Sequence, residues 1–291
     1  MMINNNSKLE VYNLYEDVGG LRLGVIHSPV TKLGFSFNIN NMRQIIRYAI
    51  RMGIKTLILP PFLPYGVFQD IRKDILESTC INRKNPYVRI LKHLASLNSS
   101  YMISPYVVEK YRSTYHISNL LIDGETGISR FFSRKIILSE NEKQANIKPG
   151  SSIDVVSDLY LKYSVLLDDD VLIVEFSRLM SYMGVDVLIT TVKQLSRNLD
   201  LVNVIKALQL FTGLTIIHVG YIIEDNAGVV ASNPSVLVLP NGSIHIYKEN
   251  NPALITIPLK VIRELRKPID LEKVRGVLEI TTQLLRRIHK Y

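Results

Sequence analysis

The sequence predicts a single large α/β domain, and three observations support that prediction. Apolar runs of strand length alternate with helical patterns along the whole chain. No Gly-, Ser- or Pro-rich linker divides its 291 residues. With 47% apolar and 21% charged residues, the chain can bury a large core and does not have the composition of a disordered protein.

The first elements are a strand, a helix and a second strand. Leu21 to Ile26 is an apolar run of strand length. An amphipathic helix is expected after Asn40, a residue able to cap it, and before Gly53. Thr56 to Leu59 predicts a buried strand that ends at Pro60, because proline cannot donate to a sheet ladder. The apolar stripe of the helix consists of Met42, Ile45, Ile46, Ala49 and Ile50.

The later elements are assigned from run length and from the turn residues between runs. Helices are expected at residues 174–183 and 202–210, and a closing helix runs from Asp270, a plausible N-cap, toward Tyr291. A hairpin turn is expected at Pro240-Asn241-Gly242. Extended segments are expected at residues 101–108, 116–122, 128–135, 155–167, 185–190, 214–223, 235–239, 244–247 and 253–258.

Local motifs, in order and at matching spacing, resemble those of the nitrilase, or carbon-nitrogen hydrolase, superfamily. The resemblance covers Leu21 to Arg266 and implies the four-layer α-β-β-α sandwich of that family. We therefore expect an N-terminal extension at residues 1–20, a nitrilase-like domain at residues 21–266 and a basic C-terminal helix at residues 267–291. The matching motifs are Leu59 to Leu63 after the buried strand, Asn119 to Gly124 before Ser133 to Leu138, Ile147 to Gly150, Val165 to Asp170 with Glu175 and Arg178, and Ser235 to Leu259 followed by Arg263 or Arg266.

The same resemblance implies that two of the three catalytic side chains of the family are replaced. The glutamate that transfers protons falls on Pro61, and the cysteine nucleophile falls on Asp168, whereas the lysine that stabilises the oxyanion is retained as Lys135. Proline has no titratable group, and a carboxylate is a far poorer nucleophile toward an amide than a thiolate. Covalent acyl transfer is therefore expected to be absent, and the lone Cys80 does not align with the lost cysteine.

An ion pair between Lys135 and Asp168 is the expected consequence, because the lysine ammonium then faces a carboxylate. Asp168 and Asp170 could also converge on a cation, but two carboxylates without histidine form a weak metal site, so no metal or cofactor is expected. Asp170, Glu175 and Arg178 are the candidate binding residues. The family places the glutamate and arginine near its dimer surface, although an i, i+3 surface ion pair explains them equally well.

Two histidines, His116 and His218, lie within apolar runs and are interpreted as hydrogen-bonded core residues rather than ligands.

The net charge of +9 is concentrated in two segments that could attract an acidic protein or a nucleic acid. Residues 81–102 carry four Lys or Arg and no acid, and residues 260–291 carry nine Lys or Arg against four acids. A solvated basic face is the simpler explanation, although Tyr87 and Tyr101 could stack on bases. The sequence lacks an apolar run long enough for a membrane span or a secretory signal, so we expect a cytoplasmic protein without a membrane partner.

Three hypotheses about function follow. The first is a catalytically inactive nitrilase-like protein, a homodimer or larger assembly, that serves as a binding, scaffold or regulatory subunit. The second is a hydrolase with a remodelled site, in which Asp168 and Lys135 act on an ester or a non-peptide carbon-nitrogen bond, or a site that senses a small metabolite. The third is direct nucleic-acid binding, whose affinity would fall steeply with salt.

Overall fold

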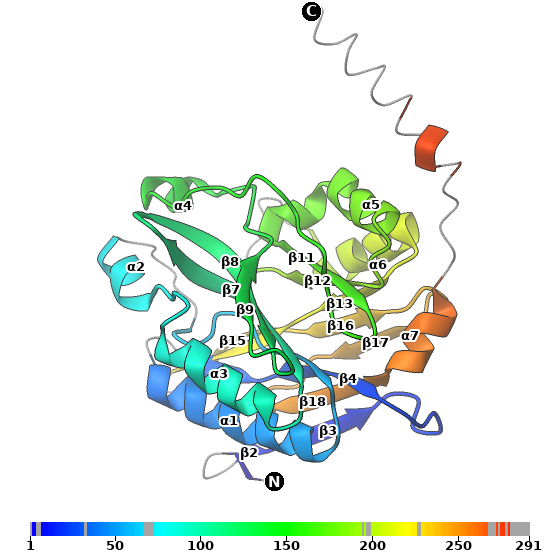
Figure 1. Cartoon of the computed structure of the whole chain (residues 1–291), viewed down its shortest axis with the longest axis horizontal. Helices are drawn as coiled ribbons and strands as arrows, with labels where there is room; N and C mark the ends of the chain where they lie inside the picture. The colour runs from blue at the N-terminus through cyan, green and yellow to red at the C-terminus, as the bar shows by residue number, and fades with distance from the viewer. Residues whose placement is uncertain are drawn as a thin grey trace, which may run out of the picture.

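The computed structural model describes residues 2–3, 7–31, 34–66, 73–193, 195, 199–225 and 228–266, together with residues 272, 274–276 and 279. Two sheets lie face to face, and helices cover the outer face of each (Figure 1). This is the α-β-β-α layering expected from the sequence. No helix within these ranges is both long and apolar enough to cross a membrane.

The larger sheet has seven strands, and α1 (Phe35–Arg51) and α3 (Pro86–Ser96) cover its outer face (Figure 1). The central strands β4, β6 and β7 run parallel to one another, whereas the pairings of β18 with β4, of β7 with β8 and of β8 with β9 are antiparallel. In spatial order the strands are β3 (Glu10–Asn13), β18 (Ala253–Pro258), β4 (Arg22–His27), β6 (Thr56–Ile58), β7 (Tyr101–Tyr111), β8 (Thr114–Asp123) and β9 (Ser129–Phe132).

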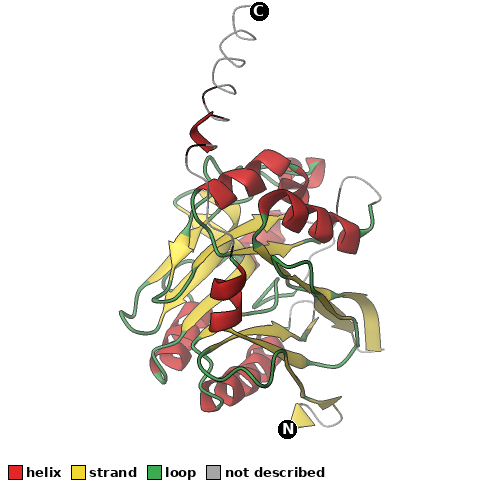
Figure 2. Ribbon diagram, turned by 90° about the vertical axis from the view of Figure 1, so that its right-hand side faces the viewer, coloured by secondary structure: helices red, strands yellow, loops and turns green. Residues whose placement is uncertain are grey.

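The smaller sheet has six strands, and α5 (Val174–Tyr182) and α6 (Leu201–Thr212) pack on its outer face (Figure 2). In spatial order the strands are β10 (Val156–Ser157), β11 (Lys162–Leu167), β12 (Val187–Thr191), β13 (Thr215–His218), β16 (Ser235–Val238) and β17 (Ile244–Tyr247).

The remaining elements connect these layers. β1 (Met2–Ile3) pairs with β2 (Ser7–Lys8), and a three-stranded sheet joins β5 (Pro29–Thr31), β14 (Tyr221–Asp225) and β15 (Gly228–Asn233). The short helices are α2 (Lys73–Thr79), α4 (Glu140–Gln144), α7 (Leu259–Leu265) and the 3-10 turn η1 (Asp168–Leu172).

Two apolar cores hold the layers together. The larger core fills the space between the sheets and beneath α1 and α3, and it includes Leu23, Ile58 and Leu254. The smaller core lies between the six-stranded sheet and the helices α5 and α6, around Met180 and Leu208. Burial on both faces explains why β6 and β12 appear in the sequence as continuous apolar runs rather than alternating ones.

Several elements differ from the sequence-based expectation. Helix α1 begins after Gly34, not after Asn40, and within it the side-chain amide of Asn38 donates to the carbonyls of Thr31 and Pro64. Helix α3 was not predicted, although Asn85 caps it by accepting from the backbone N–H of Tyr87. The expected strand 214–223 is two strands, β13 and β14, which belong to different sheets.

The structure can be compared with the predicted domain limits at both ends of the chain. Within the expected N-terminal extension, β3 pairs with β18, so the large sheet continues upstream of residue 21. The predicted C-terminal helix at residues 267–291 lies mostly outside the described residues.

Candidate functional site

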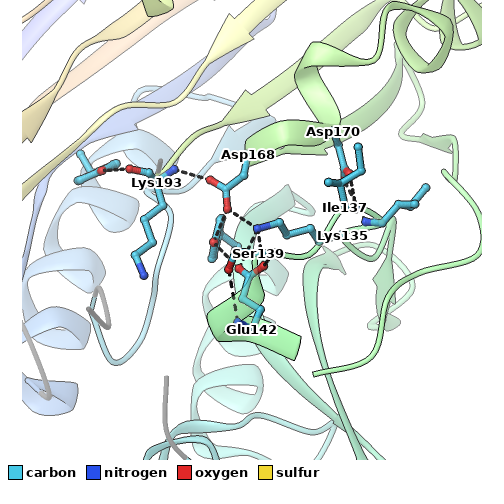
Figure 3. Close-up of polar contacts among 10 residues, drawn as sticks. Lys135, Ile137, Ser139, Glu142, Asp168, Asp170 and Lys193 are labelled. Carbon is cyan, nitrogen blue, oxygen red and sulfur yellow. Dashed lines mark hydrogen bonds and ion pairs between the residues drawn. The ribbon is translucent and has the colours of Figure 1, made fainter. Parts of the chain in front are cut away.

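The retained lysine lies at the centre of a buried polar cluster. The Nζ of Lys135 is 2.7 Å from Asp168 Oδ2 and 2.7 and 2.8 Å from the two carboxylate oxygens of Glu142 (Figure 3). Tyr106 donates its hydroxyl to Asp168 Oδ2 at 2.6 Å. These four residues, here the Lys135 cluster, are each no more than 7% exposed. The predicted ion pair between Lys135 and Asp168 is therefore confirmed, and it has a second carboxylate.

Asp168 owes its position to a sharp turn of the backbone. It follows β11 as the first residue of η1, with a φ of 47°. Positive φ is uncommon outside glycine, but aspartate tolerates it better than most residues. The turn directs one carboxylate oxygen toward Lys135 and Tyr106, while the other accepts from the backbone N–H of Lys193 at 2.6 Å (Figure 3). Both oxygens of Asp168 are thus held by hydrogen-bond donors.

Glu142 is the member of the cluster that the sequence analysis missed. Its carboxylate accepts from the backbone N–H of Ser139 at 2.7 Å, and its own N–H donates to the hydroxyl of Ser139, which forms a capping box at the start of α4. The signal was present as Ser139-x-x-Glu142, seven residues after Lys135. It predicts a helix start but gives no indication that the carboxylate also reaches the lysine.

Electrostatics keep the lysine and the tyrosine of the cluster protonated. Burial alone would lower the pKa of Lys135, but the carboxylates of Asp168 and Glu142 outweigh burial and raise it above its ordinary value. Burial, followed by the charges of Asp168 and Glu142, raises the pKa of Tyr106 well above its ordinary value. At neutral pH the cluster therefore contains a fixed ammonium and a neutral phenol that donates a hydrogen bond.

Pro61, which the resemblance aligns with the family's glutamate, lies among buried apolar groups. Pro61 follows β6 and is buried, and the next residue, Phe62, places its ring 4.6 Å from that of Tyr106 and 4.9 Å from that of Tyr221. Among the described residues, the cavity between Phe62 and Tyr106 measures only about 30 Å³. Such a volume holds one or two water molecules. Aromatic side chains therefore fill the space next to the Lys135 cluster.

Asp170 supports the lysine loop rather than a cation. Its carboxylate accepts from the backbone N–H groups of Ile136 at 3.0 Å and Ile137 at 2.8 Å. Burial raises the pKa of Asp170 to about 6, although these two amides act in the opposite direction. Asp168 and Asp170 belong to a 3-10 turn, not to a strand, and they point to different partners (Figure 3). No group of three or more His, Cys, Asp or Glu suited to a metal occurs among the described residues.

The other predicted site residues lie away from this cluster. Glu175 and Arg178 are exposed on α5, where Arg178 donates to the hydroxyl of Tyr182 at 3.1 Å; no ion pair joins them within the described structure. Arg266, rather than Arg263, bonds back into the domain, to Asp186 at 2.5 Å and to the carbonyl of Gly184 at 2.9 Å.

The two core histidines differ in how well they are satisfied. His116 uses both ring nitrogens, with the carbonyl of Lys148 at 2.9 Å and the hydroxyl of Thr114 at 3.2 Å. His218 bonds to Thr190 through Nδ1, but its buried Nε2 has no partner within the part of the chain that the structure describes. The prediction of a core histidine with both ring nitrogens hydrogen-bonded is right for His116, but it is wrong for the Nε2 of His218.

The basic segment 81–102 does not present its tyrosines to solvent. Tyr87 is fully buried with its hydroxyl 2.7 Å from that of Ser104, and Tyr101 is 7% exposed. Stacking of these rings on bases is therefore wrong as a prediction. Arg83, Lys84 and Arg89 are exposed, which is what a solvated basic face requires.

Several solved structures of nitrilase-superfamily proteins have this architecture. An amidase of the nitrilase superfamily from Nesterenkonia is 18% identical, with a TM-score of 0.67 over 88% of this chain and 97% of that one. A carbon-nitrogen hydrolase from Helicobacter pylori is 16% identical, with a TM-score of 0.71 over 91% and 98%. This chain has the nitrilase fold. A branch 10 member of the nitrilase superfamily from Saccharomyces cerevisiae has the same TM-score, 0.71, at 16% identity over 86% and 94%.

No protein-family model matches the sequence, and no curated protein matches it. The nitrilase fold is therefore recognised through three-dimensional structure and through the short motifs around Pro61, Lys135 and Asp168.

Proposed function

We propose that this chain descends from a nitrilase-superfamily hydrolase, has lost acyl transfer, and serves as a binding, scaffold or regulatory subunit. One observation carries the proposal: the Nζ of Lys135 is held by the carboxylates of Asp168 and Glu142 in a buried cluster. The sequence resemblance, which aligns Asp168 with the family's cysteine, supports the same reading. The cluster holds the fold together in place of a reactive site.

The hydrogen bonds of Asp168 argue against nucleophilic catalysis. Its oxygens already accept from Lys135, Tyr106 and the backbone N–H of Lys193. These are donors of the kind that stabilise an oxyanion during acyl transfer. Here they stabilise the resting carboxylate, so attack on a substrate would require giving up all three interactions.

The space beside the cluster argues against an amide substrate. Phe62 and Tyr106 leave a cavity of about 30 Å³ within the described structure. Small-molecule sites usually offer about 300–1,000 Å³. An acyl group could therefore enter this cavity only if Phe62 or Tyr106 moved.

Steady-state assays with a panel of amides, nitriles and esters test the proposal. We expect wild-type protein and the Asp168→Ala variant to give the same rate as buffer, because the base and the nucleophile are both missing. Turnover by the wild type that disappears in Asp168→Ala would establish the alternative, a hydrolase with a remodelled site.

We also propose a homodimer through α5 and α6. The C-terminal ends of these two helices lie together, because Ser181 Oγ donates to the carbonyl of Thr212 at 2.8 Å. An apolar patch is exposed near these ends. The patch consists of Leu179, Met183, Leu210 and Phe211, which are 43–77% exposed. Contiguous exposed apolar side chains of this kind mark protein interaction sites.

Introducing a charge into the patch is expected to separate the protomers. Sedimentation velocity should give a dimer for wild-type protein and a monomer for Phe211→Glu, because a carboxylate buried in an apolar interface lacks a partner. Leu97→Glu, at an equally exposed leucine after α3, is the matched control and should remain a dimer. A wild-type monomer, or a Phe211→Glu dimer, would contradict the proposed interface.

A further inference from the structure

A second, larger cavity lies between the two sheets at the edge formed by β3 and β17. Its volume is about 300 Å³, ten times that of the cavity beside Tyr106. Val25, Ile255 and Ile257 line it from the seven-stranded sheet, and Ile217, Val236 and Leu237 line it from the six-stranded sheet. Its rim consists of exposed side chains from the two edge strands, Tyr12, Ile244 and Ile246.

Every described residue of the lining is uncharged, and the polar ones are few. They are His218, Ser235, His245 and Tyr247, together with the rim residue Tyr12. Ser235 already bonds to His27 at 2.9 Å and to the N–H of Gly220 at 3.0 Å. Tyr247 donates its hydroxyl toward Glu10 and toward the carbonyl of Asn251, both at 3.0 Å.

The two lining histidines differ from these residues, because each has a buried Nε2 that finds no hydrogen-bond partner among the described residues. His218, at the end of β13, is fully buried and bonds to Thr190 through its other nitrogen at 3.1 Å. Buried polar atoms in folded proteins are almost always paired, so an unpaired one beside a cavity indicates a missing partner. Burial lowers the pKa of His218 to about 3, and this imidazole is therefore neutral at physiological pH.

We propose that this cavity binds a small, neutral, mostly apolar molecule whose single hydroxyl or carbonyl group hydrogen-bonds to the Nε2 of His218 or His245. The volume is at the lower end of the range for small-molecule sites, about 300–1,000 Å³. The apolar walls exclude a strongly hydrated ligand. An anion is disfavoured as well, because the lining offers no cation and Glu10 lies at the rim, where the hydroxyls of Tyr12 and Tyr247 donate to it at 2.9 and 3.0 Å.

Fluorescence titration with N-phenyl-1-naphthylamine, a neutral apolar dye, tests this site in the full-length protein. Wild type is expected to bind one dye saturably, and 1-decanol should displace it at pH 8. Decanoate, of the same chain length but charged, should displace it at least tenfold less well. His218→Phe removes one hydrogen-bonding nitrogen and should weaken displacement by 1-decanol roughly fivefold.

Two blocking variants and one control locate the dye. Ile255→Trp places an indole inside the cavity. Ile246→Trp places one at the exposed rim, so this variant folds whether or not the interior tolerates the larger ring. Ile128→Trp introduces the same side chain at an exposed isoleucine outside the cavity. The chain has no tryptophan, so a blue-shifted indole emission reports that the Ile255→Trp variant is folded and that its indole occupies the cavity.

We expect both blocking variants to lose dye binding while Ile128→Trp keeps it. No saturable binding by wild type would overturn the proposal, as would blocking variants that bind like the control, or displacement by decanoate equal to that by 1-decanol. These variants leave the Lys135 cluster intact, so the outcome is independent of whether the chain has lost acyl transfer.

Discussion

Replacing Lys135 with methionine is expected to lower the free energy of unfolding by about 3–5 kcal/mol. Methionine has a similar length but no charge, so Glu142 and Asp168 lose the ammonium that lies between their buried carboxylates. Each is at most 4% exposed, and water cannot take the place of the ammonium. Breaking a buried ion pair by removing one partner is costly because the remaining charge has been desolvated. Urea denaturation at pH 7 measures the difference.

Lys143→Met provides the matched control. Lys143 pairs with Glu140 at 2.6 Å on the exposed side of α4, with side chains 55% and 77% exposed. Surface pairs contribute about 0–1 kcal/mol, so this variant should be nearly as stable as wild type. Lys135→Met combined with Glu142→Gln and Asp168→Asn removes the stranded charges and should recover part of the loss. If Lys135→Met unfolds like Lys143→Met, the cluster does not stabilise the fold.

Truncating Phe62 to alanine is expected to cost about 3–5 kcal/mol as well. The ring is 6% exposed and packs between Tyr106 and Tyr221. Because little space surrounds it, its removal leaves a void that the neighbouring rings can close only in part. The loss should appear as a lower urea midpoint with an unchanged denaturant slope.

Phe37→Ala is the corresponding control on the outer surface. Phe37 is 37% exposed on α1, so its truncation creates no enclosed void and should cost less than about 1 kcal/mol. A loss that small for Phe62→Ala would mean that the ring borders an open pocket, where water replaces it, and would reopen the question of a substrate site.

The resemblance of short motifs to the nitrilase superfamily implied the layers of the fold and the meeting of Lys135 with Asp168. The pairing of their opposite charges followed, and the structure confirms it at 2.7 Å. The motifs themselves are readable in the sequence because spacing along a strand and its following turn is a local property. The apolar stripe of α1 was predictable for the same reason.

The parts that could not be predicted depend on contacts between distant segments. Tyr106 reaches Asp168 because β7 is irregular between Ser104 and Val107 and Tyr106 has a φ of 55°, which breaks the alternation of strand side chains. The partnerless nitrogen of His218 appears only when two sheets enclose a cavity. The three acids that begin at Asp168 were expected to lie at a strand end. They form a 3-10 turn instead, and Asp168 and Asp170 therefore bond to different partners.

Comparing the urea unfolding of wild-type protein and Asp168→Ala tests the central claim most directly. If Asp168 stabilises the fold through its partners, the variant loses about 2–4 kcal/mol, because Tyr106 and the N–H of Lys193 lose the acceptor that Asp168 provides and Lys135 loses one of its carboxylates. Removing the nucleophile of a working enzyme is usually neutral or stabilising, since active sites retain strain for the sake of catalysis. A variant as stable as wild type, or more stable, would contradict the structural role proposed for the Lys135 cluster.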